Sequence, residues 1–159
     1  DRLSLLPDVR RRNADSVSRF LVPLDVRQVG RRRWWLLAPL PYESDLVGPV
    51  IVPAEFVTDL ASVPRLPFAY MLAGDRAHGP AVVHDWLYQK PDRPPRAVAD
   101  AVFAEAMAVH QPALGFEAES ELIVFLMFSG VRAGGWKAWN DDRRRRALNP
   151  EWSATAWPA

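Results

Sequence analysis

The sequence has 159 residues, the size of one ordinary domain, and 49% of them are hydrophobic, which is enough to bury a core. There are 20 basic and 19 acidic residues, so the net charge is +1 and gives no reason to expect a nucleic-acid partner. The absence of cysteine excludes disulfides, thiolate nucleophiles and cysteine-type zinc sites. We find no signal-peptide pattern and no run of about 18 apolar residues, so we expect no transmembrane helix.

Residues 1–18 are polar and rich in arginine, and we expect them to form an arm. Residues 19–65 contain short apolar runs that end at turn residues, such as Val50-Ile51-Val52 before Pro53. This pattern predicts a small antiparallel β-sheet. Proline lacks the backbone N–H that pairs strands, so its frequency here favours edge strands or strand ends.

After this segment the spacing of apolar residues changes to that of helices, and three helices are predicted. The first covers residues 79–90, the second runs from Arg96 to His110, and the third runs from Glu117 to Val131 and stops at Gly134-Gly135. Strands followed by helices indicate the α+β class.

We therefore expect one α+β domain over residues 19–137 and a tail over residues 138–159 that is rich in tryptophan and arginine. The Arg143–Arg146 run could meet phosphates or lipid head groups, or it could be a solvated end. We expect Trp136 and Trp139 to pack against the domain.

The second predicted helix carries a carboxylate on an apolar face. Asp100 shares a helix face with Phe103 and Met107, so it is expected to point inward. A buried carboxylate is costly without a partner. The partner could be a histidine on the first helix, or Asp100 could simply neutralise Arg96 or a backbone group.

The first predicted helix offers that histidine. His84 and Tyr88 are four residues apart and face the same way, with Asp85 beside them. A histidine that acts as a base needs a second group to fix its tautomer, and Asp100 could supply it. Asp85 could then bind a cation or a substrate. Alternatively, the His-Asp pair is a structural network between two helices.

A further polar group follows the strand that ends near Val57. Thr58 and Asp59 come first, and Ser62 follows three residues later. Asp59 could be a metal ligand and Ser62 a nucleophile, although Ser62 lacks the Gly-x-Ser-x-Gly context. The alternative is an Asx or Ser turn that leads into Pro64.

Four ordered blocks resemble a phage and prophage family catalogued as domain of unknown function 1353: Val52–Arg65, Ala81–Tyr88, Arg96 with Ala99-Asp100 and Phe103, and Val131–Gly135. The resemblance covers residues 19–137. The chain has Glu55 where the pattern has glycine in a Pro-x-Gly-Phe turn. The resemblance implies a phage, prophage or gene-transfer-particle origin, and supplies no activity.

A more local similarity concerns chemistry. His84-Asp85-x-x-Tyr88, with Asp100 on the next helix, is similar to the helix pair of secreted phospholipases A2. It implies that His84 is a general base oriented by Asp100, and that Asp85 is a calcium ligand. Asp59 is a plausible further ligand, with calcium favoured over zinc and no organic cofactor expected. The supporting residues are then Thr58, Ser62, Tyr88 and Arg65. The glycine-rich calcium loop and disulfides of those enzymes are missing here.

Three functions follow as hypotheses. The first is a metal-assisted hydrolase of a lipid ester or a cell-envelope bond. The second is a non-catalytic virion component of a tail, baseplate or head-tail region, which would contact other virion proteins through the arm and the tail. The third is a toxin or counter-defence factor. The resemblance to the phage family implies a location in a virion or a bacterial host cell.

Overall fold

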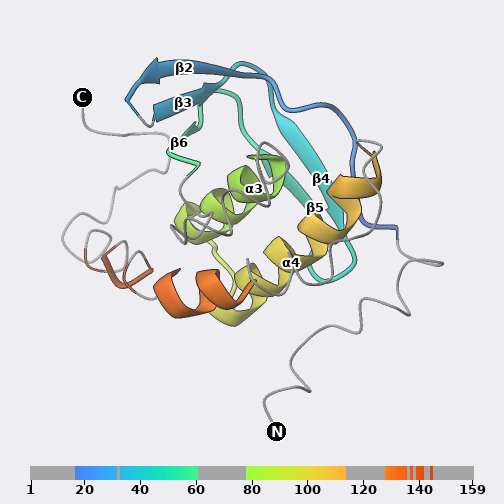
Figure 1. Cartoon of the computed structure of the whole chain (residues 1–159), viewed down its shortest axis with the longest axis vertical. Helices are drawn as coiled ribbons and strands as arrows, with labels where there is room; N and C mark the ends of the chain where they lie inside the picture. Colours follow the sequence, from blue (N-terminus) through green and yellow to red (C-terminus); the bar gives the residue numbers. More distant parts are fainter. Residues whose placement is uncertain are drawn as a thin grey trace, which may run out of the picture.

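The computed structural model describes residues 17–31, 33–60, 78–113, 128–135, 137, 139–141 and 144. Strands come first and helices follow (Figure 1), which confirms the predicted α+β class. The strands are β1 (Arg19–Phe20), β2 (Val26–Gly30), β3 (Arg33–Leu36), β4 (Leu40–Ser44), β5 (Gly48–Val52) and β6 (Val57–Thr58). The helices are α3 (His78–Gln89) and α4 (Arg96–Ala113), and residues 128–135 are also helical.

The described strands form two three-stranded antiparallel sheets, where the sequence predicted a single sheet. One has the order β1-β4-β5 and the other has the order β2-β3-β6. In β4 the side chains of Leu40, Tyr42 and Ser44 are buried, and in β5 those of Val50 and Val52 are buried. This alternation follows from the two-residue period of a strand and gives the first sheet one face toward the core.

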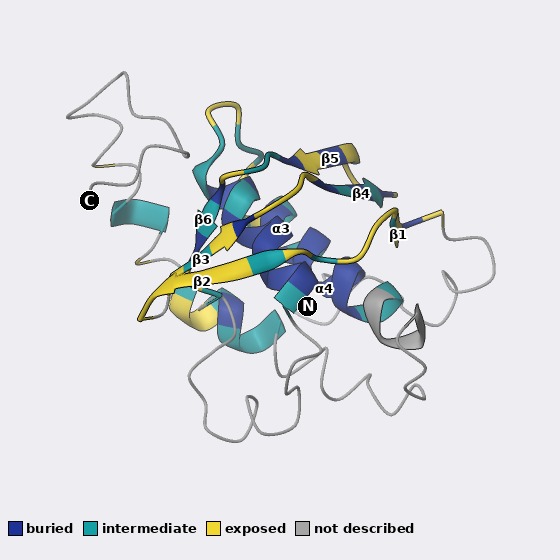
Figure 2. Cartoon of the chain, turned by 90° about the horizontal axis from the view of Figure 1, so that it is seen from above, coloured by how far each residue is buried: buried dark blue, intermediate teal, exposed yellow. Residues whose placement is uncertain are grey.

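The core lies between the sheets and the helices. Helix α4 packs against β1 and β4, and α3 packs against β5 and against α4. Figure 2 shows α3 and α4 as mostly buried, whereas β2 is exposed along most of its length. Large buried side chains come from the strand-rich half of the chain and from the helices: Tyr42, Phe56, Leu87, Phe103 and Met107.

The two helices of the pair begin and end close to the predicted residues. Pro80 lies in the first turn of α3, where its missing N–H has no helical partner to lose. The predicted stop at Gly134-Gly135 is wrong, because both glycines are helical, as are residues 137, 139–141 and 144. A glycine stop uses a positive φ, and among the described glycines only Gly48 has one. Residues 117–127 of the predicted third helix lie outside the described residues.

Residues on both sides of the predicted domain limits contact the domain. Ser18 donates a hydrogen bond of 2.7 Å to Glu105, and the Trp139 ring centroid lies 5.0 Å from that of Tyr88. The packing expected of Trp139 is confirmed. Trp136, Arg143, Arg145 and Arg146 lie outside the described residues, and the boundaries at 18 and 137 stay predictions. Within the described part of the chain, we find no helix with the length and apolarity to cross a bilayer.

Candidate functional site

The site is built where α3 and α4 pack together. His84 and Tyr88 project from one face of α3, and Asp100 projects toward them from the second turn of α4. All three side chains are buried, with His84 at 2% exposure and Asp100 at 0%. The predicted inward orientation of Asp100 and its contact with His84 are therefore present in the structure.

Asp100 accepts three side-chain hydrogen bonds. His84 Nε2 lies 2.9 Å from Oδ1, and the Tyr88 hydroxyl donates to the same oxygen. Arg132 Nη1 donates to Oδ2 at 2.9 Å. Burial alone would raise the pKa of Asp100, but the bonds from His84, Tyr88 and Arg132 together lower it. Asp100 is thus an ionised carboxylate at neutral pH.

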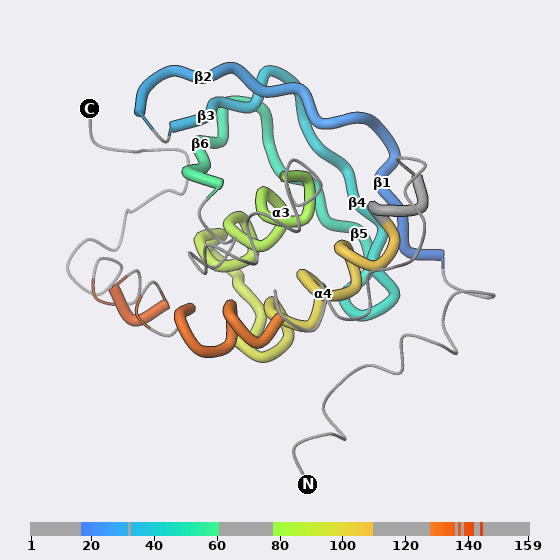
Figure 3. Tube along the Cα trace, viewed as in Figure 1, coloured from blue at the N-terminus to red at the C-terminus, as the bar shows by residue number. Residues whose placement is uncertain are grey.

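The arginine that neutralises Asp100 is Arg132, and not the Arg96 that the sequence offered as an alternative partner. Arg96 Nη1 instead donates to the backbone carbonyl of Arg132 at 3.3 Å. Figure 3 shows the segment around Arg132 beside the connection between α3 and α4, where this bond forms. Asp100 therefore joins the consecutive helices α3 and α4 to the helical residues 128–135, which lie farther along the chain.

The His84 ring has a defined tautomer. Because Asp100 is ionised and only accepts, Nε2 must carry the proton of the bond between them, and a neutral ring then leaves Nδ1 as a bare lone pair. Burial lowers the pKa of His84, against the opposing effect of Asp100, so the ring stays neutral. Nδ1 is itself buried and has no hydrogen-bond partner among the described residues.

Aromatic rings surround this imidazole. The Tyr88 ring centroid lies 4.2 Å from that of His84, and the Phe103 centroid lies 5.2 Å away. Burial and the bond to Asp100 both raise the pKa of Tyr88 well above its ordinary value, so Tyr88 donates a fixed proton. The imidazole is therefore hydrogen-bonded to a carboxylate and packed against two tilted aromatic rings.

A second contact links the site to the sheet. Thr58 at the end of β6 donates its hydroxyl to Asp85 Oδ2, and both side chains are buried. The Thr58 oxygen also accepts the backbone N–H of Leu60 at 3.0 Å. Leu60 has φ 52, which is uncommon for a bulky residue and costs about 1–2 kcal/mol. The turn after β6 is therefore held in a strained conformation next to Asp85.

The structure does not bring all the predicted residues together. Asp59 is exposed, because it follows the inward-facing Thr58 by one residue on a strand end. Ser62 and Arg65 lie outside the described residues. No group of three or more acidic or histidine side chains is placed to hold a metal in the described ranges. Calcium binding by Asp59 and Asp85 stays a prediction.

Sequence reasoning missed a second buried carboxylate, Glu105 on α4. It accepts hydrogen bonds from the hydroxyls of Ser18 at 2.7 Å, Tyr42 at 2.8 Å and Ser44 at 3.2 Å. Glu105 lies three residues after Val102, an apolar residue that is buried, so helical spacing could have revealed it. Its partners, like Arg132, are too distant in sequence for a local pattern to identify.

A family model described as "Protein of unknown function (DUF1353)" matches residues 34–115, slightly more than half of the chain. The chain is a member of the DUF1353 family. The match contains three of the four sequence blocks, together with Thr58, His84, Tyr88 and Asp100, whereas the block at Val131–Gly135 lies beyond it. No curated protein and no solved structure matches this DUF1353 protein. Membership of this family does not indicate an activity, because the family is described as being of unknown function.

Proposed function

We propose that this DUF1353 protein is a hydrolase in which His84 acts as a general base through Nδ1. The proposal rests on the hydrogen bonding and protonation of the two nitrogens of the His84 imidazole. One ring nitrogen is fixed by the buried carboxylate of Asp100, while the other is an unprotonated nitrogen with no partner among the described residues. A buried lone pair without a partner carries a desolvation cost, so a structural role alone leaves it unexplained.

The reaction follows from these two groups. Nδ1 takes a proton from a water molecule, and the water oxygen attacks the carbonyl carbon of an ester. The tetrahedral intermediate collapses when its bond to the leaving oxygen breaks, and His84 returns the proton to that oxygen. Asp100 is a positioning residue that holds the tautomer and stabilises the imidazolium formed between the two steps. We propose a lipid ester or another cell-envelope bond as the substrate.

The test compares His84→Gln with His84→Ala. A glutamine amide can still donate a hydrogen bond to Asp100 but offers no basic nitrogen. Purified variants are assayed on short-chain esters, phospholipid vesicles and isolated cell-envelope material, each with and without added calcium. The proposal predicts loss of about 10²–10⁴-fold in rate for both variants, with the His84→Gln protein still folded. Full activity in His84→Gln would contradict it.

The burial of the network favours a second candidate, a non-catalytic component of a virion particle. His84 at 2% exposure and Asp100 at 0% would then lock the helices of a protein that binds other particle proteins. In that case His84→Gln, which preserves the bond to Asp100, supports particle assembly as well as the wild type does. Normal assembly with this variant, together with no hydrolysis by the wild type, supports the second candidate, whereas hydrolysis by the wild type that His84→Gln loses supports the first.

A further inference from the structure

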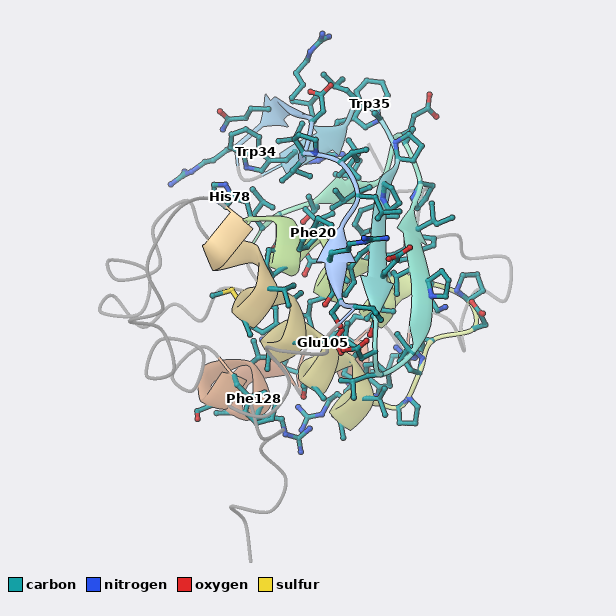
Figure 4. The ribbon with its side chains drawn as sticks, turned by 90° about the vertical axis from the view of Figure 1, so that its right-hand side faces the viewer. Phe20, Trp34, Trp35, His78, Glu105 and Phe128 are labelled. Atoms are coloured by element: carbon teal, nitrogen blue, oxygen red, sulfur yellow. The ribbon has the colours of Figure 1, made fainter. Side chains whose placement is uncertain are left out.

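The β2–β3 hairpin presents a group of exposed side chains that the fold does not use. These form the hairpin surface: Arg27, Val29, Arg31, Arg33 and Trp35. Trp35 is 38% exposed and Val29 is 46% exposed, although both are apolar. Figure 4 places Trp34 and Trp35 on this hairpin, away from Glu105 and Phe128.

Strand register shows that the arginines and Trp35 share the outer face. Arg27 on β2 lies directly opposite Trp35 on β3, and Val57 on β6 lies opposite Trp35 on the other side. Arg33 precedes Trp35 by two residues and so points to the same face. The inner face carries Leu36, which is 1% exposed and belongs to the core. Trp35 therefore points away from the core in a row with Arg27.

The charge of the hairpin has one sign. Residues 26–36 contain four arginines and no acidic residue. The nearest acidic residue in sequence, Asp25, lies at the open end of the hairpin, where its carbonyl accepts the N–H of Leu37. The chain as a whole has a net charge of only +1, so this is a local concentration of positive charge. Such a surface is complementary to an anionic partner.

We propose that the hairpin surface binds anionic phospholipid membranes. Arginine pairs with lipid phosphate, and tryptophan is enriched at the membrane–water interface because its ring is amphipathic. The exposed aliphatic side chain of Val29 favours a lipid surface over nucleic acid, since nucleic acid gains from stacked aromatic rings and not from aliphatic ones. This inference goes beyond the proposed reaction and does not depend on His84.

The test measures co-sedimentation of the full chain with vesicles of phosphatidylcholine alone and of phosphatidylcholine mixed with phosphatidylserine. We expect binding to the mixed vesicles, with a partition coefficient that falls about fivefold in Arg27→Gln. Trp35→Ala and Val29→Ser should also weaken binding. The matched control is Arg19→Gln, which removes the same charge from β1, where Arg19 pairs with Glu43 at 2.9 Å. His84→Gln should bind as the wild type does.

Three outcomes would overturn the inference. The first is equal binding to both vesicle types, and the second is an equal loss in Arg19→Gln and Arg27→Gln, which would indicate net charge alone. The third is binding of a single-stranded oligonucleotide, lost in Arg27→Gln, without vesicle binding. Circular dichroism of each variant establishes that it is folded, and Val29→Ser replaces Trp35→Ala if the latter unfolds.

Discussion

Gly135 lies against the hydroxyl of Tyr88 so closely that a Cβ added to Gly135 would meet Tyr88 Oη at 2.7 Å. The Tyr88 hydroxyl cannot simply move aside, because it donates to Asp100. A glycine at 135 therefore lets the helix that carries Arg132 approach the His84–Asp100 pair. The sequence pattern predicted a helix stop at this glycine, whereas in the structure its lack of a side chain allows close packing.

The neighbouring glycine gives a matched test of this contact. Nothing lies within 4 Å of a Cβ added to Gly134, and neither glycine has a positive φ. Gly134→Ala should raise the free energy of unfolding by about 0.5–1 kcal/mol through helix propensity. Gly135→Ala should lower it by about 1–3 kcal/mol through overpacking. Urea denaturation measures both, and equal effects in the two variants would refute the contact.

Removing Asp100 should cost more stability than removing its arginine partner. Asp100→Ala leaves the buried side chains of His84 and Tyr88 without their acceptor, and each buried polar group left unsatisfied costs about 1–3 kcal/mol. The Arg132 side chain is 38% exposed, so Arg132→Ala should cost about 1 kcal/mol. Denaturant melts of both variants measure the two losses of stability. A larger loss in Arg132→Ala than in Asp100→Ala would indicate that Asp100 is exposed in solution.

Stability should fall as the pH drops below about 6.5, because folding lowers the pKa of His84 from that ordinary value. Below this pH the unfolded chain binds a proton that the folded chain does not, so unfolding is favoured by up to about 1.4 kcal/mol per pH unit. Asp100, whose folded pKa lies below 3.8, adds a further loss at lower pH. Melting temperatures between about pH 7 and pH 5 should fall less steeply in His84→Gln. Parallel curves for the two proteins would argue against a buried neutral His84.

Replacing Glu55 with glycine should stabilise the folded protein. Its φ is 68, a conformation that favours glycine, and this is the position where the family pattern carries that residue. We expect Glu55→Gly to be about 1 kcal/mol more stable than Glu55→Ala, which keeps the strained backbone. Thermal unfolding of Glu55→Gly and Glu55→Ala measures this difference. Equal stabilities of the two variants would show that the backbone at Glu55 relaxes in solution.

Much of the site was predictable because helical periodicity is local. Spacing on the two helices placed His84, Tyr88 and Asp100 on facing stripes, and the cost of a buried carboxylate predicted that they meet. The α+β order followed from the change in apolar period, and the helix bounds from proline positions.

The remaining features depend on partners that are distant in sequence. Arg132 reaches Asp100 across 32 residues, and Ser18 reaches Glu105 across 87. The split into two sheets depends on strand pairing, such as β1 with β4, that no local pattern encodes. The predicted joint role of Asp59 and Asp85 ignored strand alternation, which buries Thr58 and exposes Asp59.

The central claim is that His84 is a neutral imidazole with its proton on Nε2 and an unprotonated Nδ1. The most direct test is ¹⁵N NMR of the histidine side chains at neutral pH, with His84→Gln used to assign the signals. We expect a protonated Nε2, coupled to its hydrogen, and an Nδ1 with the chemical shift of a bare ring nitrogen. A protonated Nδ1, in either the other tautomer or an imidazolium, would contradict the proposal.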